Sequence, residues 1–203
     1  LVTRNTGGIL VFDLPNLPVM GGGNTVIENN LVIGNDTPNF APKGNIVASV
    51  PTGTGIMIMA NEQVSVMHNW IDGNPTAAIM LVSYPKPFTD TKYNPLPRSI
   101  RLVRNNLGRN ANSPQIPGGA EILQAFGGRL PQVMWDGLGD APGADPANNL
   151  AWSLNLPAQG SGMEAARPAR LILPPPSIPA PTAGGARVPD PGAPRSLDLR
   201  ARS

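Results

Sequence analysis

Cysteine is absent from the 203 residues, and the chain has only one histidine and 14% charged residues. The absence of cysteine excludes disulfides and thiolate metal ligands. A single histidine among methionines is a poor basis for a copper or zinc centre. No hydrophobic run is long enough for a transmembrane helix. We therefore expect no metal, no cofactor and no transmembrane segment.

Charge of either sign is also scarce, and the net charge of +2 comes from the C-terminal end of the chain. Residues 157–203 contain six Arg, three acidic residues and ten Pro. Such a segment buries too little apolar surface to offset the entropy cost of ordering. We predict that residues 160–203 form a disordered, Pro/Ala/Arg-rich tail or linker. Its Arg residues lack interleaved aromatic residues, so nucleic acid is not expected as a partner.

The chain contains a repeat in which apolar residues and asparagines recur at offsets 0, 2, 5, 7 and 10. Its three copies are Thr25, Ile27, Asn30, Val32, Asn35; Val64, Val66, Asn69, Ile71, Asn74; and Ile100, Leu102, Asn105, Leu107, Asn110. A helix cannot gather that spacing on one face, whereas two short strands separated by a corner can. Each copy is therefore interpreted as two faces of one coil of a β-solenoid.

A shorter apolar pattern supplies a third strand to each coil, at residues 9–12, 56–59 and 79–82. Ile56 and Ile79 are 23 residues apart, which is the length of one coil without insertions. We predict long loops at 13–23, 36–53 and 83–98, because insertions at the turns of a solenoid leave its core intact. The coils are expected to occupy residues 1–116.

Asparagine stands at both repeated corners of every coil. Its side chain both donates and accepts hydrogen bonds and tolerates left-handed backbone angles. Stacked coils lie at strand spacing, so equivalent asparagines can pair from coil to coil. We predict two ladders, consisting of Asn30, Asn69 and Asn105, and of Asn35, Asn74 and Asn110.

Three motifs add a resemblance to this pattern. They are Thr-Gly-Gly-Ile-Leu-Val-Phe-Asp-Leu-Pro at 6–15, Asn-Phe-Ala-Pro at 39–42 and Thr-Gly-Ile-Met-Ile-Met-Ala at 54–60. Together with the Asn-rich strands they resemble exported parallel β-helix repeat proteins of the pectate lyase-like and NosD-like superfamily. The resemblance implies an all-β, right-handed parallel β-helix, of which this chain is the C-terminal portion with about three coils, and a periplasmic or extracellular location. It implies no activity. Because the chain opens in the middle of a repeat, we expect that upstream coils or a signal peptide have been removed.

Residues 117–159 keep apolar side chains but lose the repeat. We predict an irregular cap there, with a short helix near 120–126 and with Trp135 and Trp152 in its core. Such a cap protects open strand edges from aggregation.

The candidate ligand site is a groove over the middle coil, where a short link lies between two long loops. Its predicted floor is Asn61 and Glu62, and its predicted walls are Asp13, Tyr84, Lys86, Asp90, Lys92 and Tyr93. Tyrosine rings beside lysines and carboxylates suit an acidic sugar polymer. Alternatively, the Pro-rich loops only shield outward apolar residues: Leu10, Met57, Met80, Phe12, Met59 and Val82. Either a loop, with 39–42 as candidate, or another chain covers these residues.

Two functions remain open from the sequence. The first is a non-catalytic, exported binding or scaffold protein that recognises polysaccharide or a partner protein. The alternative is a lyase or epimerase acting on uronic-acid polymers, with Arg101 and Arg104 as basic groups and Ca²⁺ on carboxylates. No carboxylate pair with the separation needed for glycosidase chemistry recurs in the repeat. His68, the only imidazole, lies at a corner and is interpreted as a solvated residue.

Overall fold

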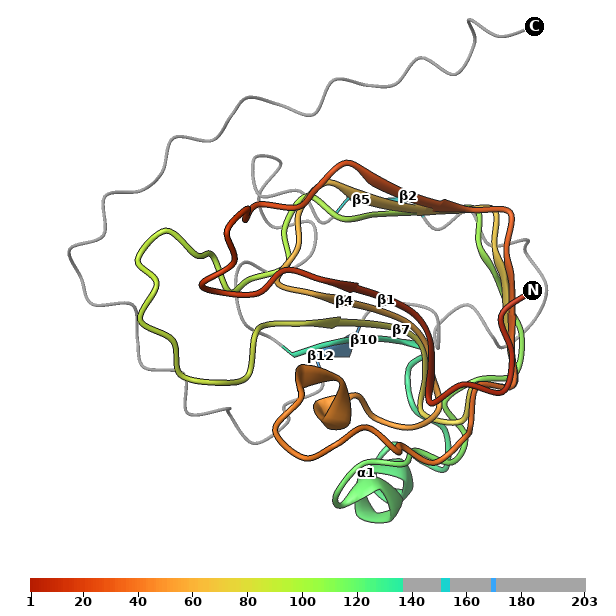
Figure 1. Cartoon of the computed structure of the whole chain (residues 1–203). Coiled ribbons are helices and arrows are strands. Elements are labelled where there is room, and N and C mark those ends of the chain that lie inside the picture. The colour runs from red at the N-terminus through yellow and green to blue at the C-terminus, as the bar shows by residue number, and fades with distance from the viewer. Residues whose placement is uncertain (137–150, 154–168, 171–203) are drawn as a thin grey trace, which may run out of the picture.

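The computed structural model describes residues 1–136, 151–153 and 169–170, and its strands form three parallel sheets (Figure 1). The first sheet contains β1 (Gly7–Phe12), β4 (Thr54–Met59), β7 (Ala77–Val82), β10 (Val133–Trp135) and β12 (Ala169–Arg170). The second contains β2 (Thr25–Glu28), β5 (Val64–Met67), β8 (Arg101–Val103) and β11 (Ala151–Ser153). The third contains β3 (Leu31–Ile33), β6 (Trp70–Asp72) and β9 (Asn106–Leu107).

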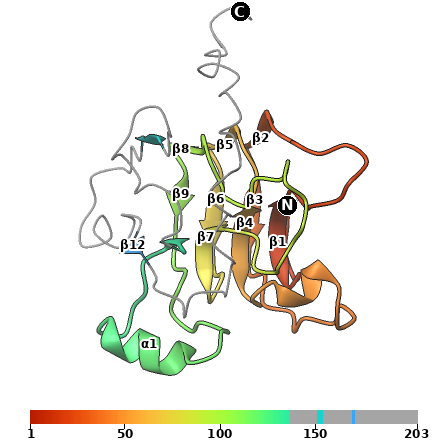
Figure 2. The ribbon, with the colours of Figure 1, turned by 90° about the vertical axis from the view of Figure 1, so that its left-hand side faces the viewer.

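The chain visits the three sheets in turn and then returns to the first, so each circuit lies beside the preceding one (Figure 2). Every strand pairing between these elements is parallel. The predicted all-β class with parallel strands is therefore confirmed. We call the circuits that begin at β1, β4 and β7 coils 1, 2 and 3.

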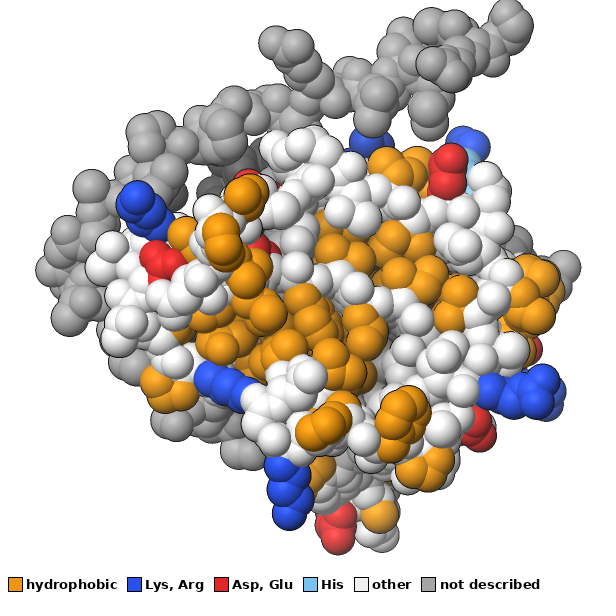
Figure 3. Space-filling model, in the orientation of Figure 1, with side chains coloured by type: hydrophobic (Ala, Val, Ile, Leu, Met, Phe, Trp, Pro, Cys, Tyr) orange, Lys and Arg blue, Asp and Glu red, His pale blue; other side chains and the backbone are white. Residues whose placement is uncertain are grey.

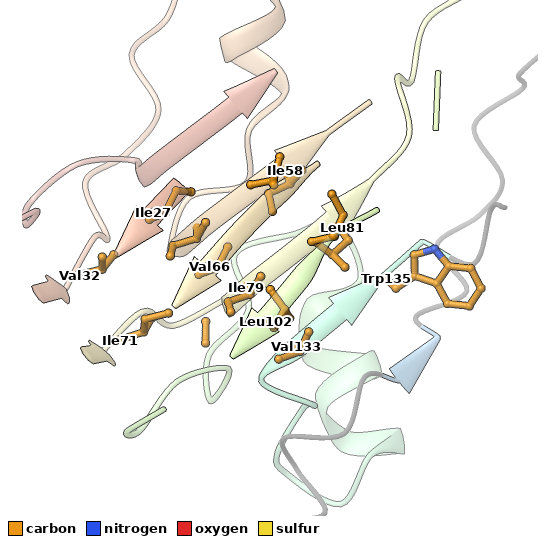
Figure 4. Packing of buried hydrophobic residues seen from close by; sticks show 14 residues of the cluster. Ile27, Val32, Ile58, Val66, Ile71, Ile79, Leu81, Leu102, Val133 and Trp135 are labelled. Atoms are coloured by element: carbon orange, nitrogen blue, oxygen red, sulfur yellow. The ribbon is translucent and has the colours of Figure 1, made fainter. Parts of the chain in front are cut away.

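Strand register agrees with the sequence repeat. Val66 of β5 pairs with Ile27 on one side and with Leu102 on the other, and all three are buried. Their neighbours along the strands point outward, because successive side chains of a strand alternate between faces. The inward residues of the three sheets meet in one hydrophobic core (Figure 4).

The predicted asparagine ladders are present between the second and third sheets and after the third sheet. The Nδ2 of Asn30 donates to the Oδ1 of Asn69 at 3.0 Å, and the Nδ2 of Asn69 donates to the Oδ1 of Asn105 at 2.9 Å. In the second ladder, Asn35 bonds to Asn74 and Asn74 to Asn110 in the same direction. Apart from the half-buried Asn30, these amides are buried, and they bond backbone groups at corners that carry no strand pairing.

The outer face of the first sheet is also apolar, and other segments cover it. Met57, Met80 and Met134 lie on this face. They pack in one cluster with Val47 of the 3₁₀ helix η1 (Ile46–Ser49) and with Val50, the residue that follows it. Loop 36–53 therefore supplies part of the cover, and loop 83–98 covers Met59 through Tyr93. Of the two predicted alternatives, a loop or another chain, the structure shows loops of this chain. Within 39–42, however, Phe40 is 85% exposed and does not contribute.

Helix α1 (Gly119–Ala125) lies along the side of the first sheet, in the region where the sequence pattern places a short helix. Its Ile122 and Leu123 pack against the same outer apolar face. Beyond it the chain re-enters the first sheet, because β10 pairs with β7 and Trp135 joins the core. This strand lies inside the segment 117–159 that the sequence pattern assigns to an irregular cap.

Most of the predicted tail, residues 160–203, lies outside the described residues, as does the side chain of Trp152. Strands β1 and β2 are edge strands of their sheets. Figure 3 shows hydrophobic side chains gathered at the centre of the molecular face that it views. Val2, Ile9 and Val11, which belong to coil 1, are only partly buried against the core. Within the described part of the chain, no helix has the length and hydropathy needed to cross a membrane.

Candidate functional site

The three long loops are linked by hydrogen bonds; loops 13–23 and 83–98 lie to the left in Figure 1, and loop 36–53 lies below the first sheet. The backbone N–H of Asn16 donates to the Oδ2 of Asp90 at 3.0 Å, which joins loops 13–23 and 83–98. The Nζ of Lys86 donates to the carbonyl of Gly44 at 3.1 Å, which joins loops 83–98 and 36–53. We call these three segments the linked loops. Loops of coils 1 and 3 therefore meet beside coil 2.

Three aromatic rings pack inside loop 83–98. The rings of Tyr84, Phe88 and Tyr93 meet edge to face, with centroid separations of 5.1 to 6.2 Å. Tyr93 is only 6% exposed, and its hydroxyl donates to the backbone carbonyl of Asp13 at 2.7 Å. Burial raises the pKa of Tyr93, with the Asp13 carboxylate as a second cause. Tyr93 consequently lies under the loop surface as a neutral donor and does not form a groove wall.

The two carboxylates predicted as groove walls organise loops. Asp13 is buried, and its Oδ1 and Oδ2 accept the N–H groups of Leu14 and Gly21. Asp90 is more exposed, and the N–H groups of Asn16 and Lys92 that it accepts lower its pKa. Both carboxylates thus accept backbone N–H groups and hold the loop backbone around them in place.

The predicted floor lies beside the end of loop 83–98. Asn61 is 4% exposed, and its carbonyl accepts the N–H of Arg98. The side chain of Arg98 forms an ion pair with Glu62 at 2.6 Å, and both side chains are partly exposed. Gly23 approaches this link so closely that a Cβ there would lie 3.1 Å from the Glu62 carbonyl. Loop 13–23 therefore runs directly against the predicted floor.

Arg98 belongs to this site although the sequence pattern does not single it out. Its only sequence signal is its position at the end of loop 83–98, just before the strand region of coil 3. In the structure, Arg98 forms a parallel β-bridge with Glu62 in the short link of coil 2. Two buried atoms near the loop bases, the Oδ1 of Asn61 and the Oγ of Ser83, have no hydrogen-bond partner among the described residues.

The structure thus brings together most of the predicted ligand-binding residues, but with different exposure. Lys92 is exposed, Tyr84, Lys86 and Asp90 are intermediate, and Asp13, Asn61 and Tyr93 are buried. The exposed part of the linked loops offers ammonium groups and one half-buried ring. In the described portion, no group of three or more His, Asp or Glu is arranged to hold a metal ion.

No protein-family model, curated protein or solved structure matches this chain. The features that characterise this chain are its strand topology, its asparagine ladders and its loop contacts.

Proposed function

We propose that this chain is an exported, non-catalytic binding scaffold with a right-handed parallel β-helix fold, and that it recognises an acidic polysaccharide. The circuit through three parallel sheets and the coil-to-coil asparagine bonds support that fold. The recognition surface is the exposed side of the linked loops. The observation that carries the proposal is that the loops of coil 1 are bonded to the long loop of coil 3, across the short link of coil 2.

Bonded loops favour binding because their conformational entropy is already lost before the ligand arrives. The surface of loop 83–98 carries Lys86 and Lys92, whose ammonium groups attract carboxylates. Asp90 lies between them in sequence, but its acceptor oxygens are occupied by backbone donors. An extended polymer suits a surface that crosses several stacked coils.

The test is calorimetric titration of the chain with uronic-acid polymers, comparing the wild type with the double variant Lys86→Ala/Lys92→Ala. We expect the double variant to bind about tenfold more weakly, which corresponds to about 1.4 kcal/mol. The matched control is Arg129→Ala, which removes an exposed cation after α1, outside the linked loops, and should leave affinity unchanged.

Three results would contradict the proposal. Wild-type protein that binds no uronic-acid polymer removes the ligand class. A double variant that binds like the wild type removes the linked loops as the site. Ultraviolet absorbance from unsaturated sugar ends, formed during incubation with polymer and Ca²⁺, would show a lyase and remove the non-catalytic assignment.

A further inference from the structure

A second polar and aromatic surface lies at the corner between the second and third sheets, to the right in Figure 1 and away from the linked loops. Its side chains flank the first asparagine ladder on the outside of the stack. We call it the corner ridge, and it consists of Asn29, Leu31, His68, Trp70, Arg104 and Asn106.

Strand register places these residues side by side. Trp70 pairs with Leu31 of coil 1 and with Asn106 of coil 3. Trp70 is 46% exposed and Leu31 is 49% exposed, although both belong to strands. One corner position away, His68 donates its backbone N–H to Val103, which places it beside Arg104. A half-exposed tryptophan therefore lies between Leu31 and Asn106 on the surface.

The ridge is held rigidly from beneath. Asn69 lies between His68 and Trp70 in sequence, points inward, and is bonded to Asn30 and Asn105 in the adjacent coils. The outward residues that precede each ladder asparagine adopt left-handed backbone angles, with φ of 57° at Asn29, 54° at His68 and 50° at Arg104. A site on such a fixed backbone loses little entropy when it binds.

The charge around the ridge is positive on coil 3. Arg101, Arg104 and Arg109 are all exposed there. Across the part of the chain that the structure describes, the only ion pair joins Arg98 to Glu62, so these three guanidinium groups have no acidic partner within it. Two acidic residues lie on the strands beside the corner: Glu28, in coil 1, and Asp72, whose Oδ1 accepts the backbone N–H of Arg109.

We infer that the corner ridge is a second ligand site, and that it takes a saccharide unit bearing a carboxylate or sulfate group. The indole of Trp70 stacks on the C–H face of the sugar ring, since aromatic faces combine apolar contact with attraction to polarised hydrogens. The guanidinium of Arg104 pairs with the acidic group. Asn106 and His68 are placed to bond ring hydroxyls. The site shares only its ligand class with the proposed function of the linked loops.

The experiment titrates the full chain with a short oligogalacturonate, recording calorimetry and tryptophan fluorescence. Trp70→Ala and Arg104→Gln are each expected to raise the Kd about tenfold. Trp70→Phe should retain most of the affinity, because it keeps an aromatic face. Matched controls are Phe126→Ala and Arg129→Gln, which remove an exposed ring and an exposed guanidinium near the end of α1 and should leave the Kd unchanged.

A second comparison separates this site from the linked loops. The variant Lys86→Ala/Lys92→Ala should bind the short oligosaccharide with an unchanged heat and fluorescence signal from the ridge. If only that loop variant loses binding, the ridge inference fails and the proposed function stands. If only the ridge variants lose binding, the ridge inference stands and the linked loops are not the binding site.

Specificity is tested with three further probes. Neutral oligogalactose should give no fluorescence change, and equal binding of the neutral and acidic oligosaccharides would overturn the role of Arg104. Duplex DNA and vesicles containing phosphatidylglycerol should bind more weakly than the oligogalacturonate. Tighter binding of either one would assign the ridge to a different class of partner and overturn the inference.

Discussion

At the scale of single residues, the inward asparagines contribute the most specific interactions in this protein. Asn69 is 1% exposed, and its Nδ2 lies 2.9 Å from both the Ile27 carbonyl and the Oδ1 of Asn105. Its Oδ1 accepts both the backbone N–H and the Nδ2 of Asn30. One side chain thus supplies partners to groups in both neighbouring coils, at a corner where water cannot reach them.

The first prediction concerns Asn69→Ala. The substitution leaves buried groups of coils 1 and 3 without partners, and each such loss costs about 1–3 kcal/mol. We expect the free energy of unfolding to fall by about 3 kcal/mol, measured by urea denaturation. The control Asn106→Ala, at an exposed asparagine in β9, should change it by less than about 0.5 kcal/mol. Equal effects of the two substitutions would contradict a stabilising ladder.

At the scale of elements, α1 depends on the sheet that it covers. The helix has seven residues and no side-chain N-cap bond, and an isolated helix of that length is not stable in water. Its partly buried Ile122 and Leu123 pack on the outer apolar face of the first sheet. The methionines of that face adapt their shape to the covering residues, because their side chains are unbranched.

The second prediction is that Ile122→Ala loosens α1 from the first sheet. Removing three carbon atoms from a partly buried site should lower the free energy of unfolding by about 1.5 kcal/mol. Amide hydrogen exchange in α1 should accelerate, while exchange in β5 stays slow. Gln124→Ala, at an exposed position of the same helix, serves as the control. Unchanged exchange in α1 of the Ile122 variant would show that other contacts hold the helix.

At the scale of the whole molecule, each coil contacts mainly the coils beside it. Coil 2 is paired on both sides, because β4 lies between β1 and β7 and β5 lies between β2 and β8. Coil 1 has edge strands in all three sheets, and among the described residues only the isolated bridge of Val2 with Val32 lies beyond β3. In such a quasi-one-dimensional stack, stability is a sum of coil terms and interface terms, so damage in the middle affects both interfaces of the damaged coil.

The third prediction compares Val66→Ala in coil 2 with Ile27→Ala in coil 1. Both replace core residues, which are at most 5% exposed. Val66→Ala should lower exchange protection in β2, β5 and β8, because it loosens both interfaces. Ile27→Ala should lower protection mainly in β2, since the end coil opens alone. The measurement is hydrogen exchange resolved by peptide, and a uniform loss of protection in both variants would indicate one cooperative unit instead.

Much of the coil architecture was predictable because it depends on local and periodic rules. The offsets of Ile27, Val66 and Leu102 correctly predicted which strands stack, and the spacing of Asn30, Asn69 and Asn105 predicted the ladder. The return of Val133–Trp135 to the first sheet was missed. That strand has three residues and follows an insertion longer than a coil turn, so no period connects it to β7.

The candidate site was less predictable, because its exposure depends on how loops pack. Sequence reasoning placed Tyr93 on a groove wall, whereas the structure buries it against coil 2, with its hydroxyl bonded to Asp13. The ion pair of Arg98 with Glu62 joins residues from different coils and has no local signature. The corner ridge was overlooked because exposed Trp70 occupies a strand position that the repeat treats as ordinary.

The sequence by itself determined the parallel strands, the coil order and the inward asparagines, because alternation within a strand and repetition along the chain are properties that the order of residues specifies. Only the tertiary structure decided which loops bond to one another, which rings are buried and which outward side chains gather at the corner ridge. These features depend on contacts between residues far apart in sequence, and such contacts exist only once the coils are stacked.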